Sequence, residues 1–542
     1  MSLRSNLKRN LNGFESVNYV SKCYDCQSFN HFFTHLQAVY LLSQTLSKST
    51  LQVSGLTLFS RLLGFTRDML IARYFGVGAA TDAFFVAFRF PNFLRRLFAE
   101  GAFAQAFVPL ISEYKTQNNL LELHQIINKI TGHLALLLAL LMLVGMMVAP
   151  LLITLCAAGF DWQGDQHILA TLLLRIMLPY GFFITLVAFM GSILNAHTQF
   201  SIPAFTPALL NLTMIGATLW LSPYFSKPII ALAFGVLLGG IVQFLFQIPA
   251  LRNLGLLPRF QLDFHNVVVK RVMKNLLPTL FATSTTQINL LMNTFVASFL
   301  TTGSVSWLYY ADRLLEFPTG ILGAALTTVM LPRLAKSHAE QDTEQFSVTL
   351  DWGLRRVILL GFPATVGLIL LAEPILSVLF QSAEFTAHDV HASSQSLIGY
   401  ALGLVGFLAI KVLTPAFTTQ STHSIAVRVA WYSLASNVGF ISLLIIPFAH
   451  GGVALATALA AIVNAGLLLI FLRKNKIYRP TTGWILFLLR VIVATSAMAT
   501  TLYFIVPVSN WTMIQLVKSI LIGVAIYGAT SFSLHKNSIS FS

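Results

Sequence analysis

Long apolar runs constrain this chain more than any other feature of its sequence. Four of them cover residues 130–159, 203–224, 228–250 and 491–508. Each approaches or exceeds the roughly 20 residues that a helix needs to cross a bilayer. A membrane β-barrel would instead show segments of about ten residues with alternating polarity, and these runs do not alternate. The sequence therefore predicts an all-α protein that crosses a membrane many times.

The charge content supports this fold class. Charged residues make up 10% of the 542 residues and hydrophobic ones 56%, whereas a soluble chain carries about 25% charged residues. Lipid accounts for the shortage, because a charge inside a bilayer is costly. The net charge of +15 fits the Lys and Arg residues that gather in cytoplasmic loops, so we predict no nucleic-acid partner.

The distribution of basic residues orients the chain. Clusters that include Arg252, Arg333 and Arg473 follow even-numbered spans, whereas the loops after odd-numbered spans hold little besides Lys227. The positive-inside rule places the basic loops, and with them both termini, in the cytoplasm. About fourteen spans are predicted, over residues 51–75, 80–110, 131–157, 169–195, 203–224, 228–250, 274–299, 304–333, 351–381, 393–420, 425–449, 452–473, 483–507 and 512–533.

A weak internal repeat predicts two lobes. Pro109 and Pro332 end two predicted spans 223 residues apart, and Ser201 and Ser424 open two others at the same offset. Each copy then holds six spans, an even number, so an axis along the membrane normal relates the lobes and a cavity lies between them. The predicted organisation is a polar, disordered N-terminal extension over residues 1–45, a first six-helix lobe over 46–252, a cytoplasmic linker over 253–273, a second six-helix lobe over 274–474 and two additional helices over 475–542.

The N-terminal extension lacks the features of a secretory signal, namely a basic start, an apolar core and a small-residue cleavage site. We interpret it as a leader or as a start site assigned too early. Cys23 and Cys26 precede His31 and His35 there, but the gap before the histidines is far shorter than in the usual zinc sites. We therefore predict no metal site, and we expect Cys156 to be a packing residue within an apolar run.

The first predicted span carries three charges within a short stretch. Arg61 and Asp68 are seven residues apart, which places them about 20° from each other around a helix, with Gly64 between them. Arg67 falls on a neighbouring face beside Gly64. The small residue would let a ligand or another helix approach closely.

The second predicted span carries a stripe of charges. Asp82, Arg89, Arg96 and Glu100 are spaced by seven, seven and four residues, so an ideal helix places all four within about 40° of one another. Arg95 falls on another face of the predicted helix. Insertion scales assign roughly 2.5–3.5 kcal/mol to each Arg or Asp at the centre of a span. The stripe is therefore expected to face water, other charges or an anionic ligand.

The charged residues of the first two predicted spans include more arginines than acids, and this excess favours an anion-binding cavity. Ion pairs that lock two helices together are the structural alternative, but they would tend to balance the charges. A surplus of guanidinium groups suits bidentate binding of phosphate or carboxylate. The eighth span adds Asp312, Arg313 and Glu316, and we expect Arg313 to reach the charged wall of the first lobe.

The stretches that carry these charges are similar to a known family. They read S-R-L-L-G-F-T-R-D over residues 60–68, A-T-D-A-F-F-V-A-F over 80–88, P-N-F-L-R-R-L-F-A-E-G-A-F over 91–103 and S-V-S-W-L-Y-Y-A-D-R-L-L-E-F-P over 304–318. They resemble the lipid II flippases called MurJ or MviN, from about residue 45 to the C-terminus. Carried over position by position, the resemblance implies substrate-binding or transport roles for Arg61, Arg67, Asp68, Asp82, Arg95, Arg96, Glu100 and Arg313.

The resemblance also implies a fold and a function. The family belongs to the multidrug/oligosaccharidyl-lipid/polysaccharide exporter superfamily, with two six-span lobes and two further helices that form a groove for a lipid tail. Its members would move lipid II, an undecaprenyl-pyrophosphate-linked sugar–peptide, across the bacterial inner membrane to the periplasmic leaflet for peptidoglycan synthesis. Lipid II, membrane lipids and cell-wall synthesis proteins are the implied partners. No catalytic residue is implied, so we predict a transporter and not an enzyme.

The expected mechanism is alternating access, with Arg67, Arg95 and Arg313 clamping the pyrophosphate of the cargo. The motif G-x-x-x-x-G-K-[ST] does not occur, so ATP is not expected to be the direct energy source. No cofactor is predicted. Two energy sources stay open: a coupled monovalent cation, and the membrane potential, which is worth about 2.3 kcal/mol per charge and 100 mV.

Other functions are compatible with parts of this pattern. The cargo could be another polyprenyl-pyrophosphate-linked oligosaccharide. A drug/cation antiporter of the same superfamily would need a cavity that does not repel cations. An enzyme acting on polyprenyl phosphates would need grouped acids and histidines, for which His388, Asp389 and His391 are the nearest set. A channel would need a symmetric pore ring, which one chain does not suggest.

Overall fold

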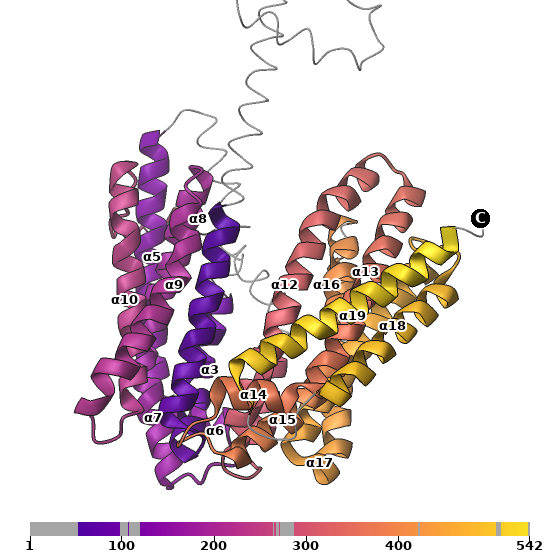
Figure 1. Ribbon diagram of the computed structural model, residues 1–542. Helices are drawn as coiled ribbons and strands as arrows, with labels where there is room; N and C mark the ends of the chain where they lie inside the picture. The colour runs from indigo at the N-terminus through magenta and orange to yellow at the C-terminus, as the bar shows by residue number, and fades with distance from the viewer. Residues whose placement is uncertain are drawn as a thin grey trace, which may run out of the picture. The chain divides into compact units, whose positions relative to one another are not determined.

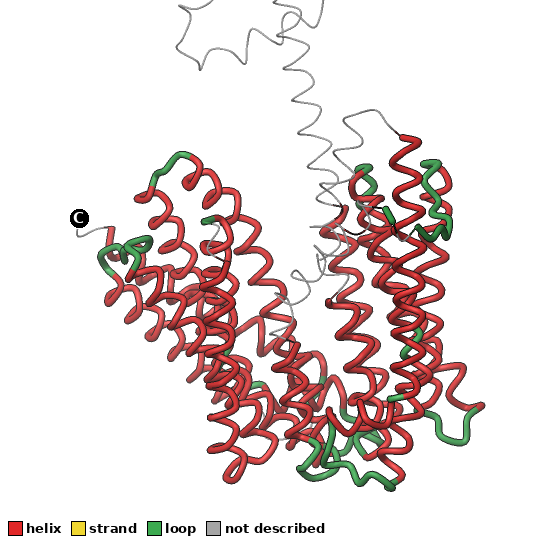
Figure 2. The backbone as a smooth tube through the Cα atoms, turned by 180° about the vertical axis from the view of Figure 1, so that it is seen from behind, coloured by secondary structure: helices red, strands yellow, loops and turns green. Residues whose placement is uncertain are grey.

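The computed structural model describes residues 52–97, 107, 120–263, 265–266, 270, 287–420, 423–505 and 511–539. Every regular element within these ranges is helical, which confirms the predicted all-α fold (Figure 2). Nine helices of the described chain are long and apolar enough to cross a membrane, and one bent helix pair adds a tenth candidate. Contacts divide the chain into residues 1–59 and 60–542, and the second unit is described below. The predicted extension and Glu100 lie outside the described residues.

The helices between residues 79 and 253 pack against one another, and Figure 1 shows them in indigo to magenta. The helical segment over residues 60–75 belongs to this first group, because Arg67 and the Ser60 carbonyl both bond Asn211. The central element of this group is α10, which contacts α7, α8 and α9. Gly235 and Gly239 of α10 lie directly against α9, as small residues do where membrane helices approach closely. The helices of this group are α3 (Ala79–Leu97), α5 (Leu120–Met147), α6 (Ala149–Cys156), α7 (Asp165–Met177), α8 (Tyr180–Ala196), α9 (Ser201–Gly216) with its continuation η3 (Ala217–Leu221) and η4 (Ser222–Tyr224), and α10 (Ile230–Asn253).

The helices after residue 303 form a second group, shown in orange to yellow in Figure 1. Within it, α17 is two helices joined at Ala449, whose φ of 45° and ψ of −124° are not helical, so its two arms correspond to two predicted spans. The helices are α12 (Ser304–Ala339), α13 (Thr343–Leu370), α14 (Ala372–Phe380), α15 (Ala387–Ala401), α16 (Leu404–Thr419), α17 (His423–Lys474), α18 (Trp484–Ile505) and α19 (Met513–Ile539).

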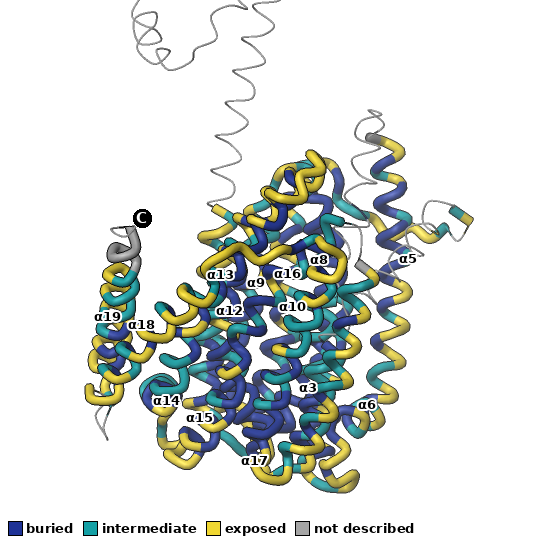
Figure 3. Tube along the Cα trace, turned by 90° about the vertical axis from the view of Figure 1, so that its right-hand side faces the viewer, coloured by how far each residue is buried: buried dark blue, intermediate teal, exposed yellow. Residues whose placement is uncertain are grey.

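The last two helices pack on each other, and α18 also packs on α13. Figure 3 shows exposed residues along both. The exposed side chains are apolar, with Ile485 exposed by 78% and Val524 by 64%. Such surfaces are stable in lipid but not in water.

One carboxylate fixes where α18 begins. Asp351 of α13 accepts hydrogen bonds from Tyr478 Oη (2.7 Å), Thr481 Oγ1 (2.5 Å), Trp484 Nε1 (2.8 Å) and Arg355 Nε (2.8 Å). The donors come from the connection between α17 and α18 and from α13 itself. Burial, together with the neighbouring Asp351 carboxylate, raises the pKa of Tyr478. The α18–α19 pair is therefore tied to the second group through charge-assisted hydrogen bonds.

The two helix groups are joined at the N-terminal ends of α3 and α12. Asp82 Oδ2 accepts a hydrogen bond from Gly303 N (2.6 Å), and Oδ1 accepts from Ser306 N (2.9 Å) and Ser306 Oγ (2.6 Å). The first turn of a helix leaves N–H groups without internal partners, and its dipole favours a negative charge. Asp82 thus caps α12 from another helix. A second link comes from Arg73, which donates to two carbonyl oxygens of α14.

Replacing Asp82 with alanine should loosen this junction, because three donors lose a charged acceptor and each such bond contributes about 1.5–3 kcal/mol. A cysteine introduced at Val305, which is 2% exposed, should react faster with a water-soluble maleimide in the Asp82→Ala background. The native cysteines are replaced by serine in every variant. The exposed acid Asp161 supplies the control, since Asp161→Asn should leave the labelling rate unchanged. Equal rates with and without Asp82 would show that the cap does not hold this junction.

Candidate functional site

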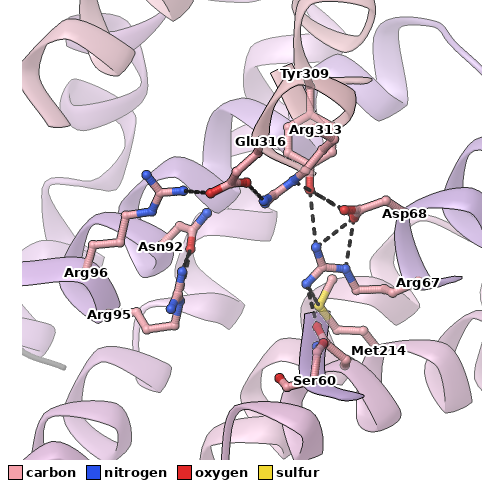
Figure 4. A network of polar contacts seen from close by, with 11 residues as sticks. Ser60, Arg67, Asp68, Asn92, Arg95, Arg96, Met214, Tyr309, Arg313 and Glu316 are labelled. Carbon is pink, nitrogen blue, oxygen red and sulfur yellow. Dashed lines mark hydrogen bonds and ion pairs between the residues drawn. The ribbon is translucent and has the colours of Figure 1, made fainter. Parts of the chain in front are cut away.

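A buried ion pair lies in the helical segment that precedes Gly76. Arg67 donates to Asp68 Oδ1 through Nε (2.9 Å) and Nη2 (2.7 Å), and to Asn211 Oδ1 of α9 through Nη1 (2.9 Å). Asn211 in turn donates to the Ser60 carbonyl oxygen (3.0 Å). Only 6% of Arg67 and 2% of Asp68 are exposed. Figure 4 shows how the guanidinium is held between the carboxylate and α9.

The second helix group reaches the same carboxylate. Tyr309 Oη of α12 donates to Asp68 Oδ1 (3.0 Å), and Arg313 Nε lies 3.2 Å from Asp68 Oδ2, although it is not aligned for a hydrogen bond. The Arg313 guanidinium also stacks over the Tyr309 ring at 5.0 Å. Asp68 therefore lies between Arg67 and Arg313, one arginine from each helix group (Figure 4).

Glu316 connects this network to α3. It accepts from Arg313 Nη1 (2.5 Å) and from Arg96 Nη2 (3.2 Å). Beside it, Arg95 donates to Asn92 Oδ1 through Nε (3.1 Å) and Nη2 (3.0 Å). Glu316 was not among the predicted site residues. Its spacing of three from Arg313 was the available signal, because such pairs are neighbours on a helix.

The network forms part of the wall of a cavity of 420 Å³ between the two helix groups. Amide side chains of α8 and α10 line it as well, among them Asn195 and Gln243. Arg61 lines it and lies against Gly320 of α12, where an added Cβ atom would meet the guanidinium. The charged side chains in the described lining are Arg61, Arg67, Arg95, Arg313, Lys411, Asp68 and Glu316.

Five cations against two acids give this lining a surplus of three positive charges. Water-filled space between low-dielectric walls strengthens the field of such a surplus and attracts anions. A cavity of this size and composition suits a phosphate or pyrophosphate group, which arginine binds with two parallel hydrogen bonds. Among the described residues, no group of three or more His, Cys, Asp and Glu side chains could hold a metal ion.

The structure brings most of the predicted residues together. Of the eight, Arg61, Arg67, Asp68, Arg95 and Arg313 line the cavity.

The other three lie elsewhere. Arg96 is linked to the network through Glu316. Asp82 is not among the lining residues, because its carboxylate is occupied by the N-terminus of α12, and Glu100 is outside the described residues. The roles of all eight in transport stay predictions.

The charged residues Asp82 and Arg96 lie on the face of α3 that contacts α12. Asp82 contacts the first turn of α12, and Arg96, fourteen residues later, contacts Glu316. Arg89 lies between them on α3 and lines a small cavity with Arg96. The periodicity argument thus identified the face of α3 that meets the second helix group.

Asp389, the acid of the set His388, Asp389 and His391, takes part in helix packing. Asp389 accepts from Thr386 N (2.9 Å) and Thr386 Oγ1 (2.7 Å) and so caps α15. It also accepts from Trp307 Nε1 at 3.0 Å. With these bonds the carboxylate holds α15 against α12, and no metal-binding group surrounds it within the described chain.

Comparison with known proteins gives the family. The family described as "Lipid II flippase MurJ" matches residues 71–522. A Haemophilus influenzae protein named probable lipid II flippase MurJ is 41% identical over 496 residues, covering 88% of this chain and 97% of its own. The Burkholderia cenocepacia protein named lipid II flippase MurJ is 40% identical over 475 residues, covering 86% of this chain and 91% of its own.

Solved structures also match this chain. A structure titled "Lipid II flippase MurJ, inward closed conformation" is 30% identical and superposes with a TM-score of 0.78 over 90% of this chain and 99% of that one. An inward-facing multidrug transporter of the MATE family and MOP superfamily, 15% identical, matches with a TM-score of 0.62 over 77% of this chain and 94% of that one, which shows a shared fold. With a matching family over most of its length and relatives that are 40% and 41% identical, the chain belongs to the lipid II flippase MurJ family.

Proposed function

We propose that this protein moves lipid II from the cytoplasmic to the periplasmic leaflet of the bacterial inner membrane by alternating access, and so supplies cell-wall synthesis. One observation carries the proposal. Arginines of two separate helix groups, Arg67 and Arg313, converge on one buried acid in a cavity with a surplus of positive charge. The family to which the chain belongs supplies the name of the anion.

The pyrophosphate would bind where Arg67, Arg95 and Arg313 converge. Asp68 and Glu316 occupy part of the hydrogen-bonding capacity of Arg67 and Arg313. They hold the guanidinium groups in fixed positions inside a low-dielectric site, which reduces the ordering that the cargo must bring about. A doubly charged pyrophosphate offers more acceptor oxygens than a carboxylate and would engage arginines of both helix groups at once.

Alternating access requires that the two helix groups separate at one end and approach at the other. The Asp82 junction holds the N-terminal ends of α3 and α12, and the basic residues Arg333 and Lys336 lie near the opposite, C-terminal end of α12. With those basic loops in the cytoplasm, the junction is the periplasmic side, and the cavity opens inward. Release of the cargo would then need Asp82 to leave the N-terminus of α12.

The polyprenyl tail would stay in lipid, along the apolar faces of α18 and α19. These two helices are tied to α13 through Asp351, so a tail bound there would stay close to the second helix group. The lobes over residues 46–252 and 274–474, the linker over 253–273 and the cytoplasmic position of both termini are part of this proposal. Cell-wall synthesis proteins are the proposed users of the exported lipid.

Substitution of Arg67 tests the arginine clamp. In cells that depend on this protein, Arg67→Ala should abolish the appearance of lipid II on the outer face of the membrane, while the protein level stays normal. Arg67→Lys should also fail, because an ammonium cannot replace the two parallel hydrogen bonds of a guanidinium. The control is Arg252→Ala, which removes an exposed arginine at the end of α10. Export that persists in the Arg67 variants would refute the clamp.

The energy source can be tested by changing the membrane potential and the monovalent cation independently. Outward movement of a cargo with net negative charge into a positive periplasm is favoured by about 2.3 kcal/mol per charge and 100 mV. Collapse of the potential with valinomycin and external K⁺ should therefore slow export in cells or proteoliposomes, whereas replacement of Na⁺ by choline at constant potential should not. The opposite pattern would assign the driving force to a coupled monovalent cation.

A further inference from the structure

The chain bends between α5 and α6, where the sequence removes a backbone donor. Val148 separates the two helices, and its φ of −90° and ψ of 11° lie outside the α-helical region. In a continuous helix the N–H of residue 150 would donate to the Met146 carbonyl oxygen. Residue 150 is proline and has no N–H, so this carbonyl loses its usual donor.

Arg175 of α7 supplies the missing donor. Its Nε donates to the Met146 carbonyl oxygen at 3.2 Å. The side chain is exposed beside apolar neighbours such as Leu172, which lies one turn before it on α7 and is 43% exposed. No other Lys, Arg, Asp or Glu occurs over residues 166–226. A charge in such an apolar surface is costly in lipid and typically pairs with a backbone carbonyl or another charge. This pairing assigns Arg175 to the bend.

The loop after α6 contacts a segment that is distant in the sequence. Gly159 N donates to Ser298 Oγ at 3.0 Å. A Cβ atom added at Gly159 would meet the backbone of Ser298, so this close approach requires glycine. The helical segment over residues 287–297 leads to Ser298, and its Asn293 donates to a threonine of α17 at 2.9 Å. Gly159 therefore joins the first helix group to the second.

This contact lies near the Asp82 junction. Ser298 comes five residues before Gly303, whose N–H donates to Asp82. In the same region α6 is held against α7, because Thr154 Oγ1 and His167 Nε2 lie 3.1 Å apart. The short helix α6, the loop after it and the start of α7 thus form one unit beside the junction of the two helix groups.

We propose that the bend between α5 and α6 is a hinge for the contact at Gly159, and that Arg175 is the positioning residue that sets it. The assignment rests on the proposed alternating access. Through the Met146 carbonyl, the Arg175 bond ties α7, and with it α6 and the following loop, to the end of α5. While that bond is in place, Gly159 reaches Ser298. Movement at the bend lets the loop leave the second helix group while α5 stays intact.

A buried cysteine beside Ser298 reports whether this contact is closed. Ala297 is 2% exposed, so Ala297→Cys in the full chain, with the native cysteines replaced by serine, should react slowly with a water-soluble maleimide. Arg175→Leu removes the donor to Met146 and should raise the labelling rate at least about fivefold, the order expected for one hydrogen bond. Arg175→Lys keeps a donor and should stay within about twofold of the native rate. The matched control Arg252→Leu removes an exposed arginine of α10 and should not change the rate.

Restoring the backbone donor separates this role from any general effect of the arginine. Pro150→Ala gives residue 150 an N–H that can donate to the Met146 carbonyl oxygen. In that background, Arg175→Leu should change the labelling rate by less than about twofold, because the two substitutions act on one acceptor. A loss of charge or packing at Arg175 would not be rescued by a residue of another helix.

A side chain at Gly159 tests the contact itself. Gly159→Leu should force the loop away from Ser298, so the cysteine introduced at Ala297 should label faster although Arg175 is intact. The same substitution should lower export of lipid II in cells, because the contact can no longer close. The control is Gly439→Leu, whose added side chain meets open space and should change neither measurement.

Other outcomes overturn the proposal. An equal rise on Arg175→Leu with and without Pro150→Ala would mean that the arginine does not act through the Met146 carbonyl, and so would loss of folded protein in both backgrounds. Folding of Arg175→Leu that depends on Pro150→Ala would support the proposal. An unchanged rate in Arg175→Leu or Gly159→Leu would show that the bend does not control the contact. Labelling needs no cargo, so expected labelling rates without lipid II export by the native protein would refute only the proposed function.

Discussion

The carboxylate of Asp68 is shared by Arg67, Tyr309 and Arg313, and the arrangement of the cavity depends on it. Burial of an ion pair brings a desolvation penalty that is offset only when geometry and further hydrogen bonds are good. Here the bonds of Arg67 to Asp68 and Asn211 satisfy most of its donors. Asp68 and Glu316 cannot neutralise the five cations of the described cavity lining, so positive charge is left over within the membrane. That imbalance favours binding of an anion.

The same interaction explains why α12 is central to the protein. Its first turn receives Asp82, its second and third turns supply Tyr309 and Arg313 to the network, and the helix of 36 residues ends beside the basic residues Lys336 and His338. A helix of this length spans about 54 Å. One helix thus connects the junction with the cavity, and in the proposed transport cycle a change in the arginine network would reach the contact between α3 and α12 through it.

The fold class was predictable from the sequence because lipid imposes long apolar runs and removes charges from them. The face of α3 was predictable too, since helical periodicity places Asp82 and Arg96 on the side that meets α12. Periodicity could not show that Asp82 is occupied by a helix N-terminus while Arg95 lines the cavity, because that depends on which helix lies alongside. Asn211 gave no signal, since a neutral amide in an apolar run resembles any other packing residue. The break of α17 at Ala449 agrees with the two predicted spans on either side of it.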